Sequence, residues 1–149
     1  MTLAEKIKIG EIMRHKPVTV NSKCTIYRAA ALMDKENIGT VLVVNDNDKL
    51  LGIVTDRQII TKVIAHHKNL ITTTIDEIMT RWPITISPED SCKEVLKKMG
   101  EFGFRRLPIE DNGKLVGIVS ISDLAPVCEF DDTCIKDIVK ELSSDTRAK

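Results

Sequence analysis

Residues 120–123, Ser-Ile-Ser-Asp, place small hydroxyls and a carboxylate where a predicted strand gives way to a helix. A carboxylate has two acceptor oxygens, so Asp123 can bind two adjacent hydroxyl donors such as those of ribose. Backbone N–H groups at a helix start favour phosphate. Arg105 and Arg106 lie just ahead of the predicted strand 107–109, and guanidinium groups match phosphate oxygens better than lysine does. Each residue also has a purely structural interpretation: Asp123 as a helix N-cap, and the two arginines as a solvated charged pair.

Two copies of one sequence unit must position these residues. Residues 9–20 contain Ile-x-x-Ile-Met followed by Pro-Val-Thr-Val, and residues 75–86 contain Ile-x-x-Ile-Met followed by Pro-Ile-Thr-Ile, at an offset of 66. Lys-Leu-Leu-Gly-Ile-Val-Thr at 49–55 then matches Lys-Leu-Val-Gly-Ile-Val-Ser at 114–120, at an offset of 65. Ordered matches of this density indicate an internal repeat, which decides the architecture.

Each copy is predicted to form a β-α-β-β-α unit, and the fold class is mixed α/β (α+β). The helix at 92–101 has Ser91 as its expected N-cap and Glu94 as its capping-box partner. Asn112-Gly113 indicates a tight hairpin, because both residues tolerate positive φ. One unit has too little core to stand alone, so we expect two pseudo-symmetric units packed through their sheets. The predicted strands are 18–20, 41–44, 50–55, 84–86, 107–109 and 115–120, and the predicted helices are 26–35, 57–66, 92–101 and 122–127.

The division along the chain is predicted as a first unit at 1–70, a second unit at 71–128 and a helical tail at 129–149. In the tail, apolar residues at helical spacing form a stripe that we expect to pack on the module, a dimer partner or another protein. They are Ile135, Ile138, Val139 and Leu142.

Composition narrows the classes of function. The 149 residues carry 22 basic and 22 acidic side chains, so the formal net charge is zero, which argues against a nucleic-acid partner. Four cysteines form no metal-binding spacing, and we expect packed or free thiols and no metal site. No apolar run is long enough to span a membrane, and the N-terminus is no signal peptide, so we expect a cytoplasmic protein. Phosphate loops of the Walker type, nucleophile elbows and Ser-His-acid sets are missing, so no enzyme is expected.

The repeated motifs resemble the cystathionine-β-synthase-type (CBS) domain, present as a tandem pair known as a Bateman module. The resemblance rests on the IxxIM openings, the PVTV and PITI strands, the IGTVLVV and FRRLPIE strands, and the GIVTDRQI and GIVSISDL junctions, over about residues 9–127. It implies a disc-like module with a cleft between the two units. It further implies adenosyl ligands (AMP, ADP, ATP or S-adenosylmethionine), homodimers of CBS pairs, and a regulatory rather than catalytic role without a cofactor.

The two units differ at the matching positions. Gln58 stands where the second unit has Asp123, and Gly39 and Thr40 stand where it has arginines. We therefore expect one competent site in the second unit and a weak one in the first. The predicted ligand-binding residues of the second unit are Thr85, Ile86, Arg105, Arg106, Leu107, Pro108, Ser120, Ser122 and Asp123, with the first strand reading the adenine edge. Those of the first unit are Thr19, Val20, Thr40, Thr55 and Gln58.

The leading functional hypothesis is a stand-alone regulatory module that senses an adenine nucleotide or another adenosyl ligand and modulates an unidentified protein. The alternative is a structural or interaction adaptor without a physiological small-molecule ligand. Asp123 distinguishes them, because a carboxylate buried as a helix cap favours the adaptor. The two arginines favour a phosphorylated ligand.

Overall fold

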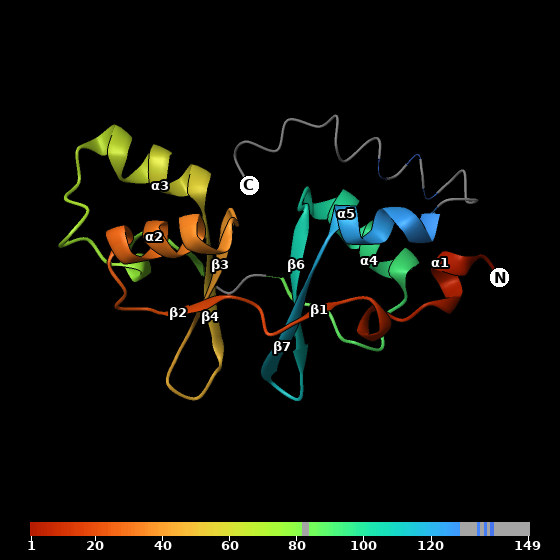
Figure 1. Cartoon of the computed structure of the whole chain (residues 1–149). Coiled ribbons are helices and arrows are strands. Elements are labelled where there is room, and N and C mark those ends of the chain that lie inside the picture. Colours follow the sequence, from red (N-terminus) through yellow and green to blue (C-terminus); the bar gives the residue numbers. More distant parts are fainter. Residues whose placement is uncertain (82–83, 129–133, 135, 137, 139–149) are drawn as a thin grey trace. The chain divides into compact units, whose positions relative to one another are not determined.

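The structure is a computed structural model and describes residues 1–81, 84–128, 134, 136 and 138 (Figure 1). These residues form two compact units. The first-repeat unit comprises the described residues within Pro17–Pro83, together with Gly113–Leu115. The second-repeat unit comprises those within Met1–Lys16, Ile84–Asn112 and Val116–Lys149. The mixed α/β fold predicted for both repeats is confirmed.

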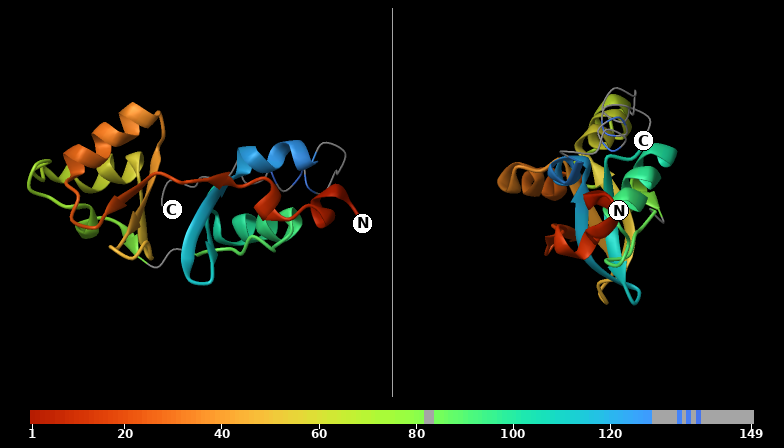
Figure 2. Two further views of the ribbon diagram at one scale, coloured as in Figure 1. Left: turned by 60° about the horizontal axis from the view of Figure 1, so that its bottom comes forward. Right: turned by 90° about the vertical axis from the view of Figure 1, so that its right-hand side faces the viewer.

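A four-stranded sheet of order β2-β3-β4-β5 forms the base of the first-repeat unit. Strands β2 and β3 are parallel, and the other neighbours are antiparallel. Helices α2 and α3 lie side by side against one face of this sheet (Figures 1 and 2). The elements are β2 (Thr19–Asn21), α2 (Ile26–Glu36), β3 (Thr40–Val44), β4 (Leu50–Thr55), α3 (Asp56–Lys62), the 3-10 turns η2 (Ile64–His66) and η3 (Ile75–Glu77), and β5 (Thr80–Arg81).

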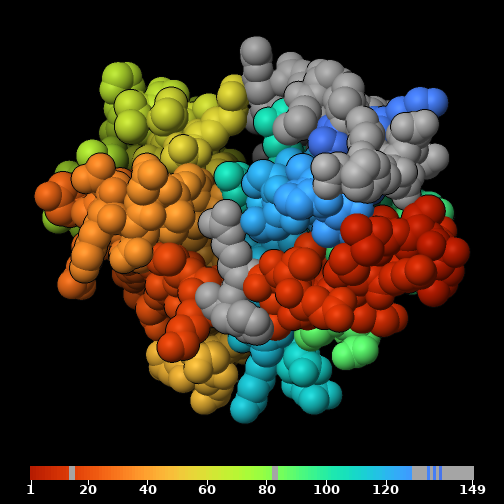
Figure 3. Space-filling view, turned by 45° about the vertical axis from the view of Figure 1, so that its right-hand side comes forward, coloured from red at the N-terminus to blue at the C-terminus, as the bar shows by residue number. Residues whose placement is uncertain are grey.

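A sheet of order β1-β7-β6 and a helical layer form the second-repeat unit. Helices α4 and α5 lie together against this sheet (Figures 1 and 2), and α1 packs on α4 and η4. In the space-filling view the N-terminal residues, in red, lie against the blue α5–η4 segment (Figure 3). The elements are α1 (Leu3–Lys6), η1 (Ile9–Glu11), β1 (Arg14–His15), α4 (Cys92–Phe102), β6 (Arg106–Asp111), β7 (Lys114–Ser120), α5 (Ile121–Leu124) and η4 (Ala125–Cys128).

Local sequence signals explain where these elements begin and end. Helix α4 starts at a capping box in which Glu94 N–H donates to Ser91 Oγ at 3.1 Å, as predicted. It ends at Gly103, whose φ of 70° suits a residue without a Cβ. The β6–β7 turn has Asn112 at φ 52° and Gly113 at φ 78°, which confirms the predicted tight hairpin. All five residues of β3 are buried, so this strand forms the centre of an aliphatic core.

The strand predicted at 84–86 is wrong in its extent. Only an isolated parallel bridge joins Ile86 to Ile109. In the first repeat, Leu42 N–H donates to the Val18 carbonyl at 3.1 Å, and Pro108 stands at the position that matches Leu42. Because proline has no N–H, the matching bond cannot form and the ladder is cut short.

The closing helix predicted at 122–127 is shorter than expected. Helix α5 ends at Leu124, and the chain continues as the 3-10 turn η4. Pro126 lies inside η4 and cannot donate the bond to the carbonyl four residues earlier that an α-helix requires.

Each opening segment packs against the helix start of the other repeat. Ile9 N–H donates to the Asp90 carbonyl at 2.8 Å, and Ile75 N–H donates to the Cys24 carbonyl at 2.8 Å. The compact units therefore exchange these segments, which a repeat in sequence does not reveal. The boundaries at 70 and 128 follow the sequence repeat and stay a prediction.

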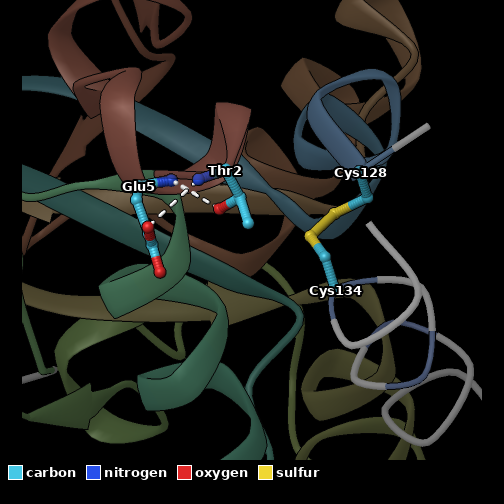
Figure 4. The surroundings of a disulfide bond; sticks show 4 residues. All are labelled: Thr2, Glu5, Cys128 and Cys134. Carbon is cyan, nitrogen blue, oxygen red and sulfur yellow. Dashed lines mark hydrogen bonds between the residues drawn. A yellow bond between two sulfur atoms is a disulfide. The ribbon is translucent and has the colours of Figure 1, made fainter. Parts of the chain in front are cut away.

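The expectation of four packed or free thiols is wrong for two cysteines. Cys128 and Cys134 form a disulfide with a Cα–Cα distance of 5.3 Å, within the ordinary range (Figure 4). Both are buried in the core of the second-repeat unit, to which the partly buried Ile138 also belongs. Cys24 and Cys92 are free, and burial raises the pKa of Cys92 to about 11. Chain spacing alone could not find the bond, because it depends on where the fold places Cys134 relative to Cys128.

The other expectations for the tail and for metals and membranes have these outcomes. Ile135, Val139 and Leu142 lie outside the described residues. Within the described part of the chain, no group of three or more His, Cys, Asp or Glu side chains could hold a metal ion. The helices of the same residues are all too short or too polar to cross a membrane.

Candidate functional site

The second-repeat junction is the set Arg105, Arg106 and Ser120–Asp123, at the point where β7 passes into α5. Ser120 is the N-cap of α5, and its Oγ accepts from Asp123 N–H at 3.3 Å. The half-buried Asp123 carboxylate in turn accepts from Ser120 N–H at 2.8 Å. Asp123 is therefore the third helical residue of a capping box rather than the N-cap considered from the sequence.

Capping fixes the orientation of the Asp123 carboxylate. A carboxylate has about four acceptor positions, and the bond from Ser120 N–H uses one, through Oδ2. Ser122 is exposed, and its Oγ lies 2.8 Å from Ser120 Oγ. The capping bond by itself therefore does not exclude a second role for this carboxylate.

A backbone hydrogen bond brings the arginines to this junction. Ile121 N–H, at the start of α5, donates to the Arg105 carbonyl at 2.9 Å. Arg105 is half-buried, and Arg106 is exposed as the first residue of β6. Residues that carry guanidinium groups, hydroxyls and a carboxylate therefore lie close together along the backbone at one end of the sheet.

The remaining predicted residues of this repeat contribute differently. Ile86 and Leu107 are buried core residues, so they offer a ligand mainly their backbone. Ile86 N–H is already bonded to the Pro108 carbonyl at 3.1 Å. Thr85 is half-buried, and its carbonyl accepts from Lys98 Nζ at 3.5 Å.

The first-repeat junction is the set Gly39, Thr40 and Thr55–Gln58, and it has the same backbone frame. Thr55 caps α3, and Gln58 Oε1 accepts from Thr55 N–H at 2.9 Å. The Gln58 amide nitrogen donates to Thr80 Oγ1 at 2.8 Å. Both polar atoms of Gln58 are thus engaged within the unit, which supports a weaker site. Of the other predicted residues, Thr19 is exposed and Val20 is buried.

An acidic residue takes part in this junction that sequence reasoning missed. Asp56 N–H donates to the Gly39 carbonyl at 2.9 Å, which matches the bond between Ile121 and Arg105. The Asp56 carboxylate lies directly over Gly39: a Cβ added there would be 3.0 Å from Asp56 Oδ2. The aligned repeats carried a signal for this difference, because Asp56 stands opposite the apolar Ile121.

Comparison with known proteins identifies the repeats. Residues 9–65 and 75–129 each match the family model of the CBS domain. An uncharacterized protein of Methanopyrus kandleri is 33% identical over 140 residues, 93% of this chain and 71% of that protein. The CBS domain-containing protein CBSCBSPB1 of Arabidopsis thaliana is 34% identical over 107 residues. This match covers 72% of this chain but only 20% of that protein.

One solved structure that is similar to this chain contains bound ligands. The CBS domain pair of protein MJ0100, in complex with 5′-methylthioadenosine and S-adenosyl-L-methionine, has a TM-score of 0.72 and 32% identity. The match covers 80% of this chain and 94% of that one. These matches indicate a domain family and no enzyme family. The chain therefore belongs to the CBS domain family and contains two CBS domains in tandem.

Proposed function

We propose that this chain is a regulatory module that binds a phosphorylated adenosyl ligand at the second-repeat junction and alters a protein partner in response. The ligand's ribose hydroxyls are assigned to the Asp123 carboxylate, and its phosphate to Arg105 or Arg106. The adenine edge is assigned to the backbone around Thr85. A homodimer, a regulated protein partner and a cytoplasmic location remain predictions from the family resemblance.

One observation carries the proposal. The bond from Ile121 N–H to the Arg105 carbonyl holds two guanidinium-bearing residues beside an oriented carboxylate and an exposed serine hydroxyl. These are the groups that a ribose phosphate requires, and they are held by backbone geometry rather than by chance surface contacts. The adenosyl ligands of the CBS pair of MJ0100 support the choice of an adenosyl compound.

Thermal unfolding with a panel of adenosyl ligands tests the proposal. A ligand at about 100 times its Kd stabilises the folded protein by about 2.7 kcal/mol. For a chain of this size that raises Tm by about 5–10 °C. We expect this shift with AMP, ADP or ATP, and its loss in Asp123→Ala. A shift that survives in Asp123→Ala would move the site away from the second-repeat junction.

A second candidate function is an adaptor without a small-molecule ligand. It is favoured by the capping bond between Ser120 N–H and Asp123, because a capping role alone explains a carboxylate at this position. If it is correct, no adenosyl ligand shifts Tm at millimolar concentration, and Asp123→Ala changes only the stability of the unliganded protein.

A further inference from the structure

The two junctions share a backbone frame but carry opposite charges at one matched place. In the second repeat the matched position is Arg105, whose carbonyl accepts from the N–H of the buried Ile121 at the start of α5. In the first repeat the matched residue is Gly39, which has no side chain, and the Asp56 carboxylate lies over it. A cationic group has thus been exchanged for an anionic one.

We propose that Asp56 makes the first-repeat junction select adenosyl ligands with a neutral or cationic 5′ substituent and reject those with a 5′-phosphate. The inference rests on the proposed function, because it assigns the 5′ substituent in both repeats to the place that Arg105 marks. A phosphate placed there in the first repeat meets the Asp56 carboxylate, and like charges repel. A sulfonium group there meets an opposite charge.

A second feature of the first-repeat junction is a buried hydroxyl. Thr40 is only 8% exposed, and its Oγ1 has no hydrogen-bond partner among the described residues. Thr40 pairs with Thr55 across β3 and β4, so it lies beside the N-cap of α3. A buried hydroxyl without a partner costs free energy, and such a group in a native protein calls for an explanation such as a missing ligand or water.

Arg57 is the one cation that opposes this selection within the junction. It is exposed, stands where the second repeat has Ser122, and its N–H donates to Asp56 Oδ1 at 2.8 Å. The charges of Asp56 and Arg57 in the first-repeat junction therefore cancel, whereas the second-repeat junction has a net charge of +1 from Arg105, Arg106 and Asp123. Because Asp56 is the group that lies over Gly39, it decides the sign of the charge at the 5′ position.

Three ligands that differ in the charge of the 5′ substituent test the inference: S-adenosylmethionine (cationic sulfonium), 5′-methylthioadenosine (neutral thioether) and AMP (anionic phosphate). Isothermal titration calorimetry uses the full chain with Arg105→Ala, Arg106→Ala and Asp123→Asn, which we call the silenced chain. These substitutions remove binding at the second-repeat junction, so the measured affinity is that of the first-repeat junction. Asp56→Asn is then added, which keeps an acceptor for Arg57 N–H but removes the charge. The matched control is Asp48→Asn, an exposed acid in the β3–β4 turn whose φ of 59° asparagine also tolerates.

We expect 5′-methylthioadenosine and S-adenosylmethionine to bind more tightly than AMP. Asp56→Asn should strengthen AMP binding about three- to tenfold and weaken S-adenosylmethionine binding by a similar factor, leaving 5′-methylthioadenosine unchanged. Asp48→Asn should change none of the three. If the silenced chain does not fold, the same comparison is made with Asp56→Asn in the otherwise unchanged chain, fitted to two sites.

The outcomes separate this inference from the proposed function. If each of the three ligands binds Asp56→Asn as tightly as it binds Asp48→Asn, the role of Asp56 is refuted and the proposed function is not. The same conclusion follows if AMP binds the unchanged chain but no ligand binds the silenced one. Failure of every ligand to bind the unchanged chain would overturn both proposals.

Discussion

Asp123 has two roles in the proposed site, and substitutions can separate them. Asp123→Asn keeps a side-chain oxygen that can accept from Ser120 N–H, so the capping box survives. It removes the charge and one acceptor, and a hydrogen bond to a charged group contributes about 1.5–3 kcal/mol. We therefore expect the Kd for AMP to rise about 10- to 150-fold while the free energy of unfolding changes little. Asp123→Ala should also lose the hydrogen bond from Ser120 N–H, which costs about 1 kcal/mol of stability.

Gln58 offers a matched control, since it holds the same capping position in the first repeat. Gln58→Ala should lose the hydrogen bond from Thr55 N–H, lower the free energy of unfolding by about 1 kcal/mol and leave AMP affinity unchanged. Isothermal titration with AMP and urea denaturation measure the two effects on the same preparations. If Asp123→Asn binds AMP within about twofold of the unchanged chain, the carboxylate serves only as a cap, and the ribose assignment is refuted.

Four further predictions concern stability. Gly52→Ala should lower the free energy of unfolding by about 1–3 kcal/mol, because its Cβ would lie 2.7 Å from a carbonyl oxygen of β5. A Cβ added at Gly100 would have no neighbouring atom within 4 Å, so Gly100→Ala should instead stabilise α4 by about 1 kcal/mol. If urea denaturation shows the same change in stability for Gly52→Ala and Gly100→Ala, this reasoning is wrong. A hydrogen bond from Lys23 holds the pKa of Asp76 below its usual value. The Asp76 carboxylate therefore stabilises the fold above about pH 4, and this stabilisation is lost as the pH falls through the folded-state pKa. The stability difference between the unchanged chain and Asp76→Asn should therefore shrink below pH 4, and a constant difference would refute the assignment. Reduction of the Cys128–Cys134 disulfide by a dithiol should lower the free energy of unfolding by about 2 kcal/mol, and a protein with both cysteines changed to serine should show no response to the reductant.

The sequence predicts most of the fold because its signals are local. Capping residues, the Asn112-Gly113 turn and alternating apolar patterns act within a few residues, so the helices at 26–35 and 92–101 and the central strands lie where they were expected. The position of the second-repeat junction was also predictable, because one backbone bond, from Ile121 to Arg105, joins two motifs that the repeat had already aligned.

Apart from the helix at 122–127, which Pro126 shortens locally, the parts that sequence reasoning missed depend on contacts between distant residues. The strand at 84–86 failed because Pro108, more than 20 residues later, removes a donor from its partner strand. The exchanged opening segments follow from bonds such as the one between Ile9 and Asp90, which no local pattern encodes. The engagement of Gln58 with Thr80 likewise requires the three-dimensional arrangement of β5 beside α3.

The constraint that the two repeats share is the helix cap, and the property that varies between them is charge. Position 58 and position 123 must each supply an acceptor for the N–H of the capping residue, and both glutamine and aspartate do so. The cap therefore does not choose between glutamine and aspartate, and an aspartate that caps the helix can also take part in binding. Arg105 and the glycine that matches it likewise supply the same carbonyl to the start of the following helix, so their side chains are free to differ. The helix cap itself requires neither the charge of Asp123 nor the guanidinium of Arg105, so capping alone does not account for their occurrence together in one repeat.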